Sequence, residues 1–329
     1  MFTADDLSVV IPCYNGKQTI LACLESLYHQ DEAPGEVILV DSSADGTLEL
    51  VAKHYPEVHC FHFPYRVFPG PARNQGVEIA KGRIIAFIDA DCIAASDWTA
   101  HIAAQHAAGH QIVGGAVELG NPNSALAWAG HLMEFREFLP KGPAHTMMHV
   151  PTCNISYRRN LLEEYGGFPD SYYPQEDLLF NHLLHRNGFT IWFDPAIRVK
   201  HFCRDNLIGY LSHQHRIGRV TCVTLSRTQM QGSEISRRPW LAWLAAPGLG
   251  MLKYLRTTTA FFGFARAESF RHPGLLVVLL LGSIWWVRGF AAGARTGLSG
   301  IRGVIDPEEN IFILMKQCSR DQDDREPGN

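Results

Sequence analysis

The sequence predicts an α/β fold, a mostly parallel sheet flanked by helices, with a helical appendage after it. Two observations predict this. In the first half, short runs of β-branched residues alternate with stretches whose apolar residues recur at helical spacing, which is typical of parallel sheets with helices on both faces. From Pro239 onward, aromatic and apolar clusters interspersed with Lys and Arg replace that pattern. A chain of 329 residues can hold one catalytic domain of ordinary size and such an appendage.

Charge divides the chain at nearly the same place. Residues 1–197 carry 11 Lys+Arg and 23 Asp+Glu, a balance of −12, whereas residues 198–302 carry 15 and 3, a balance of +12. Residues 303–329 return to −4. A basic segment interleaved with apolar runs favours a membrane leaflet or a phosphorylated lipid as its partner. Nucleic acid is the weaker explanation, because no nucleic-acid-binding motif appears.

The cysteines and the N-terminus bear on the compartment. None of the eight cysteines makes a C-x-x-C pair, so we expect reduced thiols in a cytosolic protein. Asp5 and Asp6 stand where a signal peptide would be basic, so we expect no export signal.

The predicted elements follow one another in β-α order. Apolar runs predict four strands, over 7–11, 36–40, 60–63 and 83–88. Pro12 is expected to end the first of them. Helical spacing predicts the connecting helices: one from about residue 20, and two over 47–54 and 71–80. The order β-α-β-α-β-α-β predicts a parallel sheet with helices on both faces.

The fourth strand ends in two carboxylates, Asp89 and Asp91. Open α/β sheets bind ligands at the carboxyl ends of their strands, and two carboxylates in an apolar neighbourhood are costly without a cation. Mg²⁺ and Mn²⁺ favour one or two carboxylates together with phosphate oxygens. The pair therefore predicts a divalent cation that also holds a diphosphate, with a strand that exits into a polar turn as the alternative.

Two other nucleotide-binding patterns are missing from the sequence. The glycines after the first two strands form no G-x-G-x-x-G, and no G-x-x-x-x-G-K-[ST] occurs, so a dehydrogenase-type site is not expected. Asp41 closes the second strand. It suits a base or ribose contact, with a simple turn cap as the alternative.

Four segments, in this order and at this spacing, resemble the signatures of family-2 glycosyltransferases with the GT-A fold: 8–15 (SVVIPCYN), 40–47 (VDSSADGT), 70–76 (GPARNQG) and 87–91 (FIDAD). The resemblance covers roughly residues 7–220. It implies a nucleotide-sugar donor, a Mg²⁺ or Mn²⁺ cofactor and inversion at the sugar. The residues that it implies for the donor site are Pro12, Tyr14 and Asp41 at the nucleoside, Arg73 at the base or diphosphate, and Asp89 and Asp91 at ribose and metal.

A pair of acids, Glu176 and Asp177, begins a predicted helix over 178–186. The helix dipole alone would favour acids there. An inverting sugar transfer also needs a carboxylate that takes the proton of the acceptor hydroxyl. The family carries a Glu-Asp pair at this place, and we expect Asp177 to be the base in preference to Glu176.

The resemblance also implies roles for residues nearer the appendage. His201 follows a predicted strand, where the family often places a histidine at the metal, although a lone histidine is more often structural. Arg216 and Arg219 are candidates for clamping the diphosphate, with an ordinary basic helix face as the alternative. Gly218 stands where processive members carry Trp in Gln-x-x-Arg-Trp, so a single addition is expected.

The appendage contains an apolar run of 14 residues, 274–287, that ends at Arg288. A helix of that length reaches only about 21 Å, short of the ~30 Å hydrocarbon core of a bilayer. Its aromatic and basic flanks favour an interfacial or re-entrant segment over a spanning one. A buried pair of helices in a soluble protein is the alternative.

These observations predict three parts: a GT-A domain over 1–220, with a donor half at about 1–118 and an acceptor half at about 119–220; a basic, apolar, membrane-associated region over 221–304; and a charged tail over 305–329. The predicted enzyme moves one sugar from a nucleotide-diphosphate sugar to a lipid-linked or surface-polysaccharide acceptor on the cytoplasmic face of the membrane. A sugar nucleotidyltransferase-like enzyme and an inactive sugar- or lipid-binding scaffold are the alternatives. The nucleotidyltransferase should carry a Gly-rich, Arg/Lys-containing loop where this chain has Pro12-Cys13-Tyr14-Asn15-Gly16.

Overall fold

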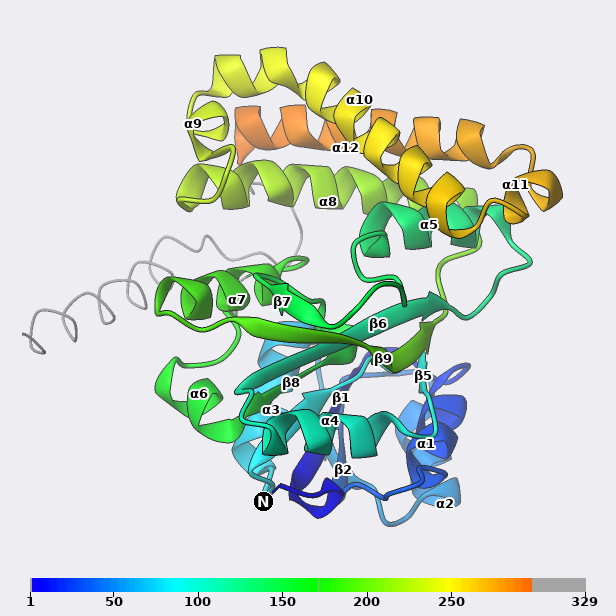
Figure 1. Cartoon of the computed structure of the whole chain (residues 1–329), viewed down its shortest axis with the longest axis vertical. Coiled ribbons are helices and arrows are strands. Elements are labelled where there is room, and N and C mark those ends of the chain that lie inside the picture. The colour runs from blue at the N-terminus through cyan, green and yellow to red at the C-terminus, as the bar shows by residue number, and fades with distance from the viewer. Residues whose placement is uncertain (1, 171, 298–329) are drawn as a thin grey trace, which may run out of the picture. The chain divides into compact units, whose positions relative to one another are not determined.

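The computed structural model describes residues 2–170 and 172–297 (Figure 1). These residues form two compact units. Unit 1 holds the chain up to residue 116 together with 142–199, and unit 2 holds 117–141 together with the chain from residue 200. The predicted tail over 305–329 and the last residues of the predicted 221–304 region lie outside the described residues. The predicted three-part division stays a prediction.

Unit 1 is built around a mixed sheet whose strands lie in the order β3-β2-β1-β4-β8-β6-β9-β5, with β7 paired to β9. Its strands are β1 (Leu7–Cys13), β2 (Glu36–Asp41), β3 (His59–His62), β4 (Ile84–Phe87), β5 (Cys92–Ala94), β6 (Ile112–Leu119), β7 (His145–Met147), β8 (Ile155–Arg158) and β9 (Ile191–His201). Its helices are α1 (Ile20–Tyr28), α2 (Thr47–His54), α3 (Pro69–Ile79), α4 (Trp98–Ala107), α6 (Arg159–Glu164) and α7 (Glu176–Arg186), with short 3₁₀ turns η1 (Ala4–Asp6) and η2 (Thr152–Asn154).

The expectation of a mostly parallel sheet holds for the first four strands. β1 pairs in parallel with β2 and β4, and β2 pairs in parallel with β3. β8 then runs antiparallel to both β4 and β6, and β7 runs antiparallel to β9. The sheet is therefore mixed, because β8 returns directly beside β4 instead of being reached through a right-handed helical crossover.

The expectation that Pro12 ends the first strand was wrong. β1 continues to Cys13, and Pro12 lies opposite Val40 of β2. On its other side, β1 pairs with β4 only as far as Val10, which lies opposite Phe87. The absence of a backbone N–H at Pro12 is tolerated because Pro12 lies beyond the last residue of β1 that pairs with β4.

The core of unit 1 lies between the parallel strands and their helices. All four residues of β4 are buried, as its continuous apolar run predicts. α3 packs on β1 and β2. It can do so closely because Gly76 faces Val10, and a side chain at Gly76 would occupy the space of the valine. This packing fixes α3, the helix that carries Arg73, against the strands whose ends form the candidate site.

Unit 2 is helical. It consists of α5 (Ala125–Phe135), α8 (Leu207–Arg227), α9 (Ser233–Ser236), α10 (Pro239–Phe264), α11 (Glu268–Arg271) and α12 (Leu275–Thr296). The long helices α8, α10 and α12 lie alongside one another (Figure 1), and α12 contacts both of the others. One apolar core joins α5 to this bundle through Leu132, Tyr210, Phe261 and Leu279. The segment 117–141 is thus part of the same packed unit as the C-terminal helices.

α8 and α12 pack backbone to backbone. A Cβ at Gly218 of α8 would collide with the carbonyl oxygen of Trp286, and a Cβ at Gly289 of α12 would collide with that of His215. Small residues at such crossings let two helices approach closely. Gly218 therefore has a packing role within unit 2. Among the described residues, α12 is also the one helix long and apolar enough, by length and composition, to cross a membrane.

Candidate active site

The two strand-end carboxylates of unit 1 lie in a tight turn. The amide of Cys92 donates to the carbonyl oxygen of Asp89 over 3.0 Å, so the chain reverses between Asp89 and β5. Asp89 and Asp91 are both partly exposed, whereas Ile88 and Cys92 on either side are buried. The turn presents two carboxylates at the carboxyl end of β4, as the sequence predicts for a cation site.

Arg73 of α3 joins this turn to the acid pair. Its Nη2 lies 2.9 Å from Oδ1 of Asp89, and its Nη1 lies 2.7 Å from Oε1 of Glu176. Arg73 is only 3% exposed. Burial alone would lower the pKa of Arg73, but the carboxylates of Asp89 and Glu176 outweigh it and raise that pKa. The alternative that Arg73 is a surface helix residue is wrong, since it lies at a buried junction of two predicted site segments.

The two acids that begin α7 differ in their surroundings. Glu176 is 4% exposed, and burial raises its pKa to about 7 against the opposing charge of Arg73. Asp177 is half-buried. Its Oδ2 accepts the backbone amide of Thr152 over 3.2 Å, and its Oδ1 accepts that of Leu178 over 2.7 Å. The carboxylate of Glu176 thus forms an ion pair with Arg73, whereas that of Asp177 is more accessible to solvent. Sequence reasoning did not find Thr152.

The residue before the acid pair has an unusual backbone. Gln175 has φ 84°, a left-handed conformation that is uncommon outside glycine. Such strain concentrates at functional sites, where the surrounding structure holds it in place. Here it turns the chain so that both acids come immediately into the first turn of α7.

Asp41 at the end of β2 is fully buried and organises a turn. Oδ1 accepts the hydroxyl of Ser43 over 2.5 Å, and Oδ2 lies 2.9 Å from Nδ1 of His62. Ser43 in turn accepts the backbone amide of Asn15 over 2.7 Å, which ties the loop after β1 to the loop after β2. These bonds support the alternative of a turn cap; the base or ribose contact stays a prediction.

Tyr14 lies in the loop after β1 and is 45% exposed. The guanidinium of Arg66 lies 4.4 Å from the centroid of its ring, and Pro12 precedes it at the end of β1. A flat aromatic face with a cation over it can contact a base or a diphosphate. Sequence reasoning missed Arg66 because a lone arginine in the loop between β3 and α3 carries no pattern.

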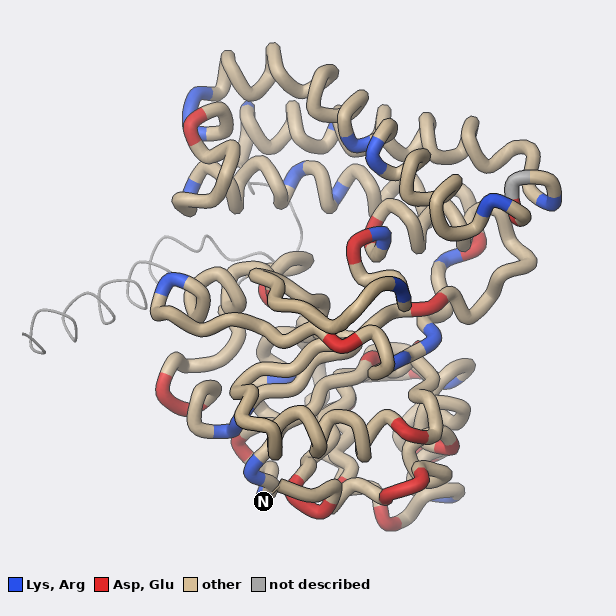
Figure 2. Tube along the Cα trace, viewed as in Figure 1, with Lys and Arg blue, Asp and Glu red and all other residues tan. Residues whose placement is uncertain are grey.

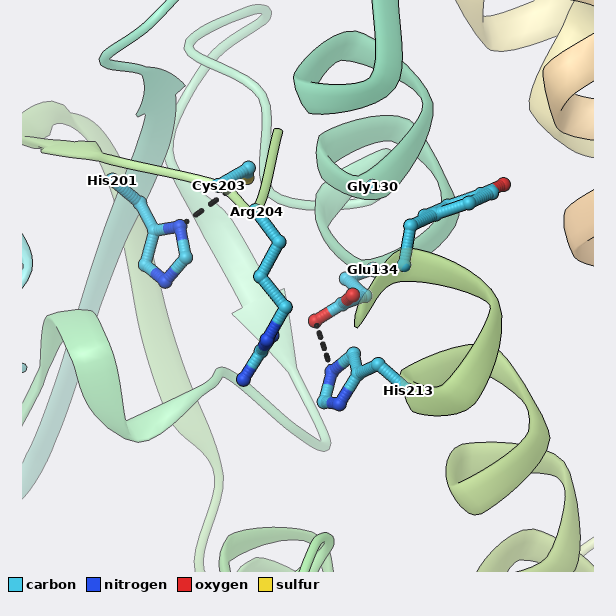
Figure 3. A pocket seen from close by; sticks show the side chains of 7 residues that line it. Gly130, Glu134, His201, Cys203, Arg204 and His213 are labelled. Carbon is cyan, nitrogen blue, oxygen red and sulfur yellow. Dashed lines mark hydrogen bonds and ion pairs between the residues drawn. The ribbon is translucent and has the colours of Figure 1, made fainter. Parts of the chain in front are cut away.

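Unit 2 holds a pocket of its own, lined by Gly130, Glu134, His201, Cys203, Arg204, Tyr210 and His213 (Figure 3). Nε2 of His213 lies 3.2 Å from Oε2 of Glu134. The side chain of Arg204 extends between His201 and His213 in Figure 3. Burial would raise the pKa of Glu134, but the charges of His213, Arg204 and His201 lower it to about 2. Sequence reasoning missed Glu134, which lies in the mostly apolar helix α5.

The three residues predicted nearer the appendage all lie in unit 2. His201 ends β9, and its Nδ1 lies 3.3 Å from Sγ of Cys203. Arg216 is exposed on α8. Arg219 donates from Nε to the carbonyl oxygen of Gly297 over 2.9 Å, at the end of α12. That bond supports the alternative of a structural basic residue for Arg219; the metal and diphosphate roles stay predictions.

The chemistry of the unit 1 site fits a hard divalent cation. Asp89 and Asp91 offer carboxylate oxygens, the ligands that Mg²⁺ and Mn²⁺ prefer. Arg73 contacts Asp89 through Oδ1 of the carboxylate. The site therefore combines the carboxylate oxygens of Asp89 and Asp91, the buried guanidinium of Arg73 and the accessible carboxylate of Asp177.

Residues 8–166 match the family model described as glycosyl transferase family 2. The match contains all four segments on which the resemblance rests. The chain belongs to glycosyltransferase family 2. The family predicted from the sequence is therefore confirmed.

Two relatives are similar in sequence to part of this glycosyltransferase. Glycosyltransferase AglE of Haloferax volcanii is 28% identical over 220 residues, which make up 65% of this chain and 72% of the relative. The Escherichia coli protein described as UDP-Glc:alpha-D-GlcNAc-diphosphoundecaprenol beta-1,3-glucosyltransferase WfaP is 39% identical over 87 residues, 26% of this chain and 35% of the relative. The chain spans only about a third of that second relative.

A solved structure shares the fold of this glycosyltransferase. The mannosyltransferase PcManGT from Pyrobaculum calidifontis, in complex with GDP-Man and Mn²⁺, superposes with a TM-score of 0.59 at 17% identity. The match covers 92% of this chain and 90% of that one. It shows the GT-A-like α/β fold with its helical C-terminal region.

Proposed function

We propose that this glycosyltransferase moves one sugar from a nucleotide-diphosphate sugar to a lipid-linked or surface-polysaccharide acceptor, with inversion and without processivity. The observation that carries the proposal is the Arg73 junction. One buried guanidinium contacts both Asp89 of the strand-end pair and Glu176 of the acid pair. This contact supports the proposal that the residues predicted to act on the donor and on the acceptor form one site within unit 1.

The proposed step is a displacement at C1 of the donor sugar. The acceptor hydroxyl oxygen forms a bond to C1 while the bond from C1 to the diphosphate oxygen breaks with its electron pair. The hydroxyl proton passes to Asp177, which is accessible and oriented by the amides of Thr152 and Leu178. Glu176 is the alternative base, but its pairing with Arg73 favours a role in positioning that guanidinium.

Asp89 and Asp91 would hold a Mg²⁺ or Mn²⁺ ion, with His201 as the proposed third ligand. When bound, the ion offsets the charge that develops on the leaving diphosphate. The Mn²⁺ complex of PcManGT supports a divalent cation in this fold. Arg66 over Tyr14 is placed to contact the nucleotide from the loops after β1 and β3, and Arg216 and Arg219 are the further diphosphate candidates.

The acceptor and the location are also proposals. WfaP, which is described as acting on a diphosphoundecaprenol-linked acceptor, supports a lipid-linked acceptor here. Nucleotide sugars are made in the cytosol, so we place the enzyme on the cytoplasmic face of the cell membrane. α12 and the basic apolar composition of unit 2 support membrane association.

A donor panel tests the proposal. Purified full-length protein is incubated with UDP-, GDP- and dTDP-sugars and Mn²⁺ or Mg²⁺, and release of the nucleoside diphosphate is measured with and without lipid-linked acceptors. We expect one donor to be consumed, faster with acceptor. Formation of a nucleoside triphosphate and a sugar 1-phosphate when inorganic pyrophosphate is added would indicate the nucleotidyltransferase alternative instead. Binding of a donor without any turnover would indicate the inactive scaffold.

A further inference from the structure

Large apolar side chains are exposed along the whole length of one face of α10. Trp240 is 65% exposed and Leu244 64%, and the face continues through Met251 and Leu255 to Phe262. At 100° per residue these positions fall within one narrow arc, flanked by two further exposed residues. We call the set the α10 stripe: Trp240, Trp243, Leu244, Met251, Leu252, Leu255 and Phe262.

Lys253 and Thr257 of α10 lie away from this face, and the hydroxyls of Thr258 and Thr259, which lie on or beside it, are bonded to backbone carbonyl oxygens of the same helix. Lys253 donates from Nζ to the carbonyl oxygen of Met133 over 3.0 Å and lies 5.7 Å from the ring centroid of Trp286. Thr257 is fully buried. A surface helix of a soluble protein shows the opposite arrangement, with its charges toward water and its apolar side toward the core. α10 is therefore built for an apolar medium on its exposed side.

α12 extends this surface but is held to the protein on its other side. Leu276, Val277, Leu280 and Ile284 are exposed. Its glycines face α8, where a side chain at Gly289 or Gly293 would collide with backbone atoms of His215 and Arg219. A crossing of the membrane by α12 would either break this contact or draw the charged helix α8 into hydrocarbon, where each charge is costly.

The charge of the C-terminal helices favours lipid over a second copy as the occupant. Among residues 239–297, five exposed basic residues stand against one acidic residue: Arg256, Arg266, Arg271, Arg288 and Arg295 against Glu268. Figure 2 marks Lys and Arg positions in blue on α10 and around α11, and Arg288 and Arg295 belong to α12. Two copies meeting through this surface would bring like charges together, whereas anionic headgroups would attract them.

Aromatic and basic side chains are also paired at the edges of this surface. The guanidinium of Arg295 lies 5.8 Å from the ring centroid of Trp243, and that of Arg288 lies 5.6 Å from that of Trp285. Tryptophan with a neighbouring cation is typical of the boundary between headgroups and acyl chains. The α10 stripe is therefore suited to the acyl chains of one leaflet, and the neighbouring cations are suited to its headgroups.

We propose that the α10 stripe inserts into the headgroup and upper acyl region of an anionic leaflet, so that unit 2 lies on one side of the membrane and α12 does not cross it. This inference deepens the proposed location and does not depend on the proposed chemistry. It names the contact surface, the lipid class and the depth.

Vesicle binding tests the stripe with the full-length chain. Sedimentation with vesicles of phosphatidylcholine alone is compared with vesicles containing about a third of phosphatidylglycerol. We expect strong binding to the anionic vesicles only, and a loss of at least roughly tenfold in partitioning for Met251→Glu/Leu255→Glu, because both apolar groups would no longer be buried in lipid. Met148→Glu in unit 1, which replaces a side chain that is also 65% exposed, is the matched control and should bind like the wild type.

Folding and self-association are separated from lipid contact in the same experiment. Circular dichroism and donor hydrolysis in detergent-free buffer should be equal for the double variant and the wild type. Equal vesicle binding by the two proteins would overturn the proposal. So would a dimer of the wild type, seen by analytical ultracentrifugation without lipid, that Met251→Glu/Leu255→Glu dissociates, because a second copy would then cover the stripe.

Depth and topology have their own measurements. Lipids brominated near the top of the acyl chain should quench tryptophan fluorescence of the wild type, and Trp240→Phe/Trp243→Phe should bind equally but be quenched less. A protease added outside the vesicles should remove a tag placed after Asn329 completely. A protected tag would show that the chain crosses the bilayer and would overturn the proposal. Failure of the glycosyl transfer assay would leave each of these results unchanged.

Discussion

Arg73 and Glu176 lie 103 residues apart in the sequence, and their side chains meet over 2.7 Å in the interior of unit 1. Both are nearly fully buried. The contact makes α3 and the start of α7 parts of one site, although neither segment alone indicates a partner. It also carries an energetic consequence, because a buried charge that loses its partner is strongly destabilising.

The first prediction is a double-mutant cycle on that pair. Arg73→Met should lower the free energy of unfolding by about 3–5 kcal/mol, because it leaves the carboxylate of Glu176 buried without its cation. Arg73→Met/Glu176→Met should recover much of that loss, since it removes both charges. Urea unfolding measures the free energy of unfolding. We expect neither variant to turn over the donor. Additive losses would mean that the two side chains are not coupled.

The second prediction concerns the proposed base. Asp177→Asn should lower kcat by roughly 10²–10⁴-fold, the usual contribution of general acid–base groups, while the donor Kd stays nearly unchanged. Steady-state kinetics and donor titration measure the two quantities. Glu164→Gln, at an exposed position in α6, is the control and should keep wild-type kinetics. Equal loss of donor binding in Asp177→Asn would show a donor ligand or a structural group instead.

The third prediction concerns the cation. Asp91→Asn should abolish turnover and weaken donor binding only when Mn²⁺ or Mg²⁺ is present, because the variant keeps the turn but loses a carboxylate ligand. Calorimetric donor titrations with metal and with chelator measure this. Asp31→Asn, on an exposed loop, should behave like the wild type. Full activity of the wild type in excess chelator would rule out the metal role.

The fourth prediction uses two glycines of unit 2. Gly218→Ala should lower the free energy of unfolding by about 1–3 kcal/mol, because its methyl group meets the backbone of Trp286. Gly263→Ala, on α10 with open space around it, should instead raise stability by about 0.5–1 kcal/mol through its better helix propensity. Thermal unfolding distinguishes the two signs. Stabilisation by both would mean that α8 and α12 do not pack closely.

The fifth prediction concerns acid sensitivity. Burial lowers the pKa of His131 in α5 from 6.5 to about 3. The unfolded chain binds more protons there between pH 3 and 6.5, so this residue makes stability rise with pH in that window and fall as the pH drops through it. His131→Phe, among the rings of Trp128 and Phe135, should flatten that slope by up to about 1.4 kcal/mol per pH unit.

Much of unit 1 could be predicted from the sequence because its signals are local. The apolar run that ends at Asp89 and Asp91 contains both the buried strand and its polar end, and the periods of the flanking segments give the helices. The prediction that Pro12 ends the first strand was wrong because the missing N–H breaks a strand only where a neighbouring strand would accept a hydrogen bond from it. That depends on where the ladder with β4 ends, and the sequence of β1 does not contain this information.

The rest depended on contacts between distant segments. Glu134 acquires its surroundings from His213 of another helix, 79 residues away, and no spacing rule connects them. Arg66 becomes notable only because Tyr14 lies beneath it. The composition of 221–304 predicted membrane association, but which side of α10 is exposed depends on how that helix packs against α12. Periodicity alone cannot distinguish a protein-facing stripe from a lipid-facing one.

The separation between Arg73 and Glu176 also has a consequence during synthesis. The ribosome completes β1 to β4, and with them the donor-side strands, long before the start of α7 emerges. Until then the guanidinium of Arg73 has the carboxylate of Asp89 but lacks that of Glu176, and the site cannot close in its native form. A fragment that stops before Glu176 would therefore lack one of the two ion pairs of Arg73, and we expect it to be less stable than the same residues in the full chain.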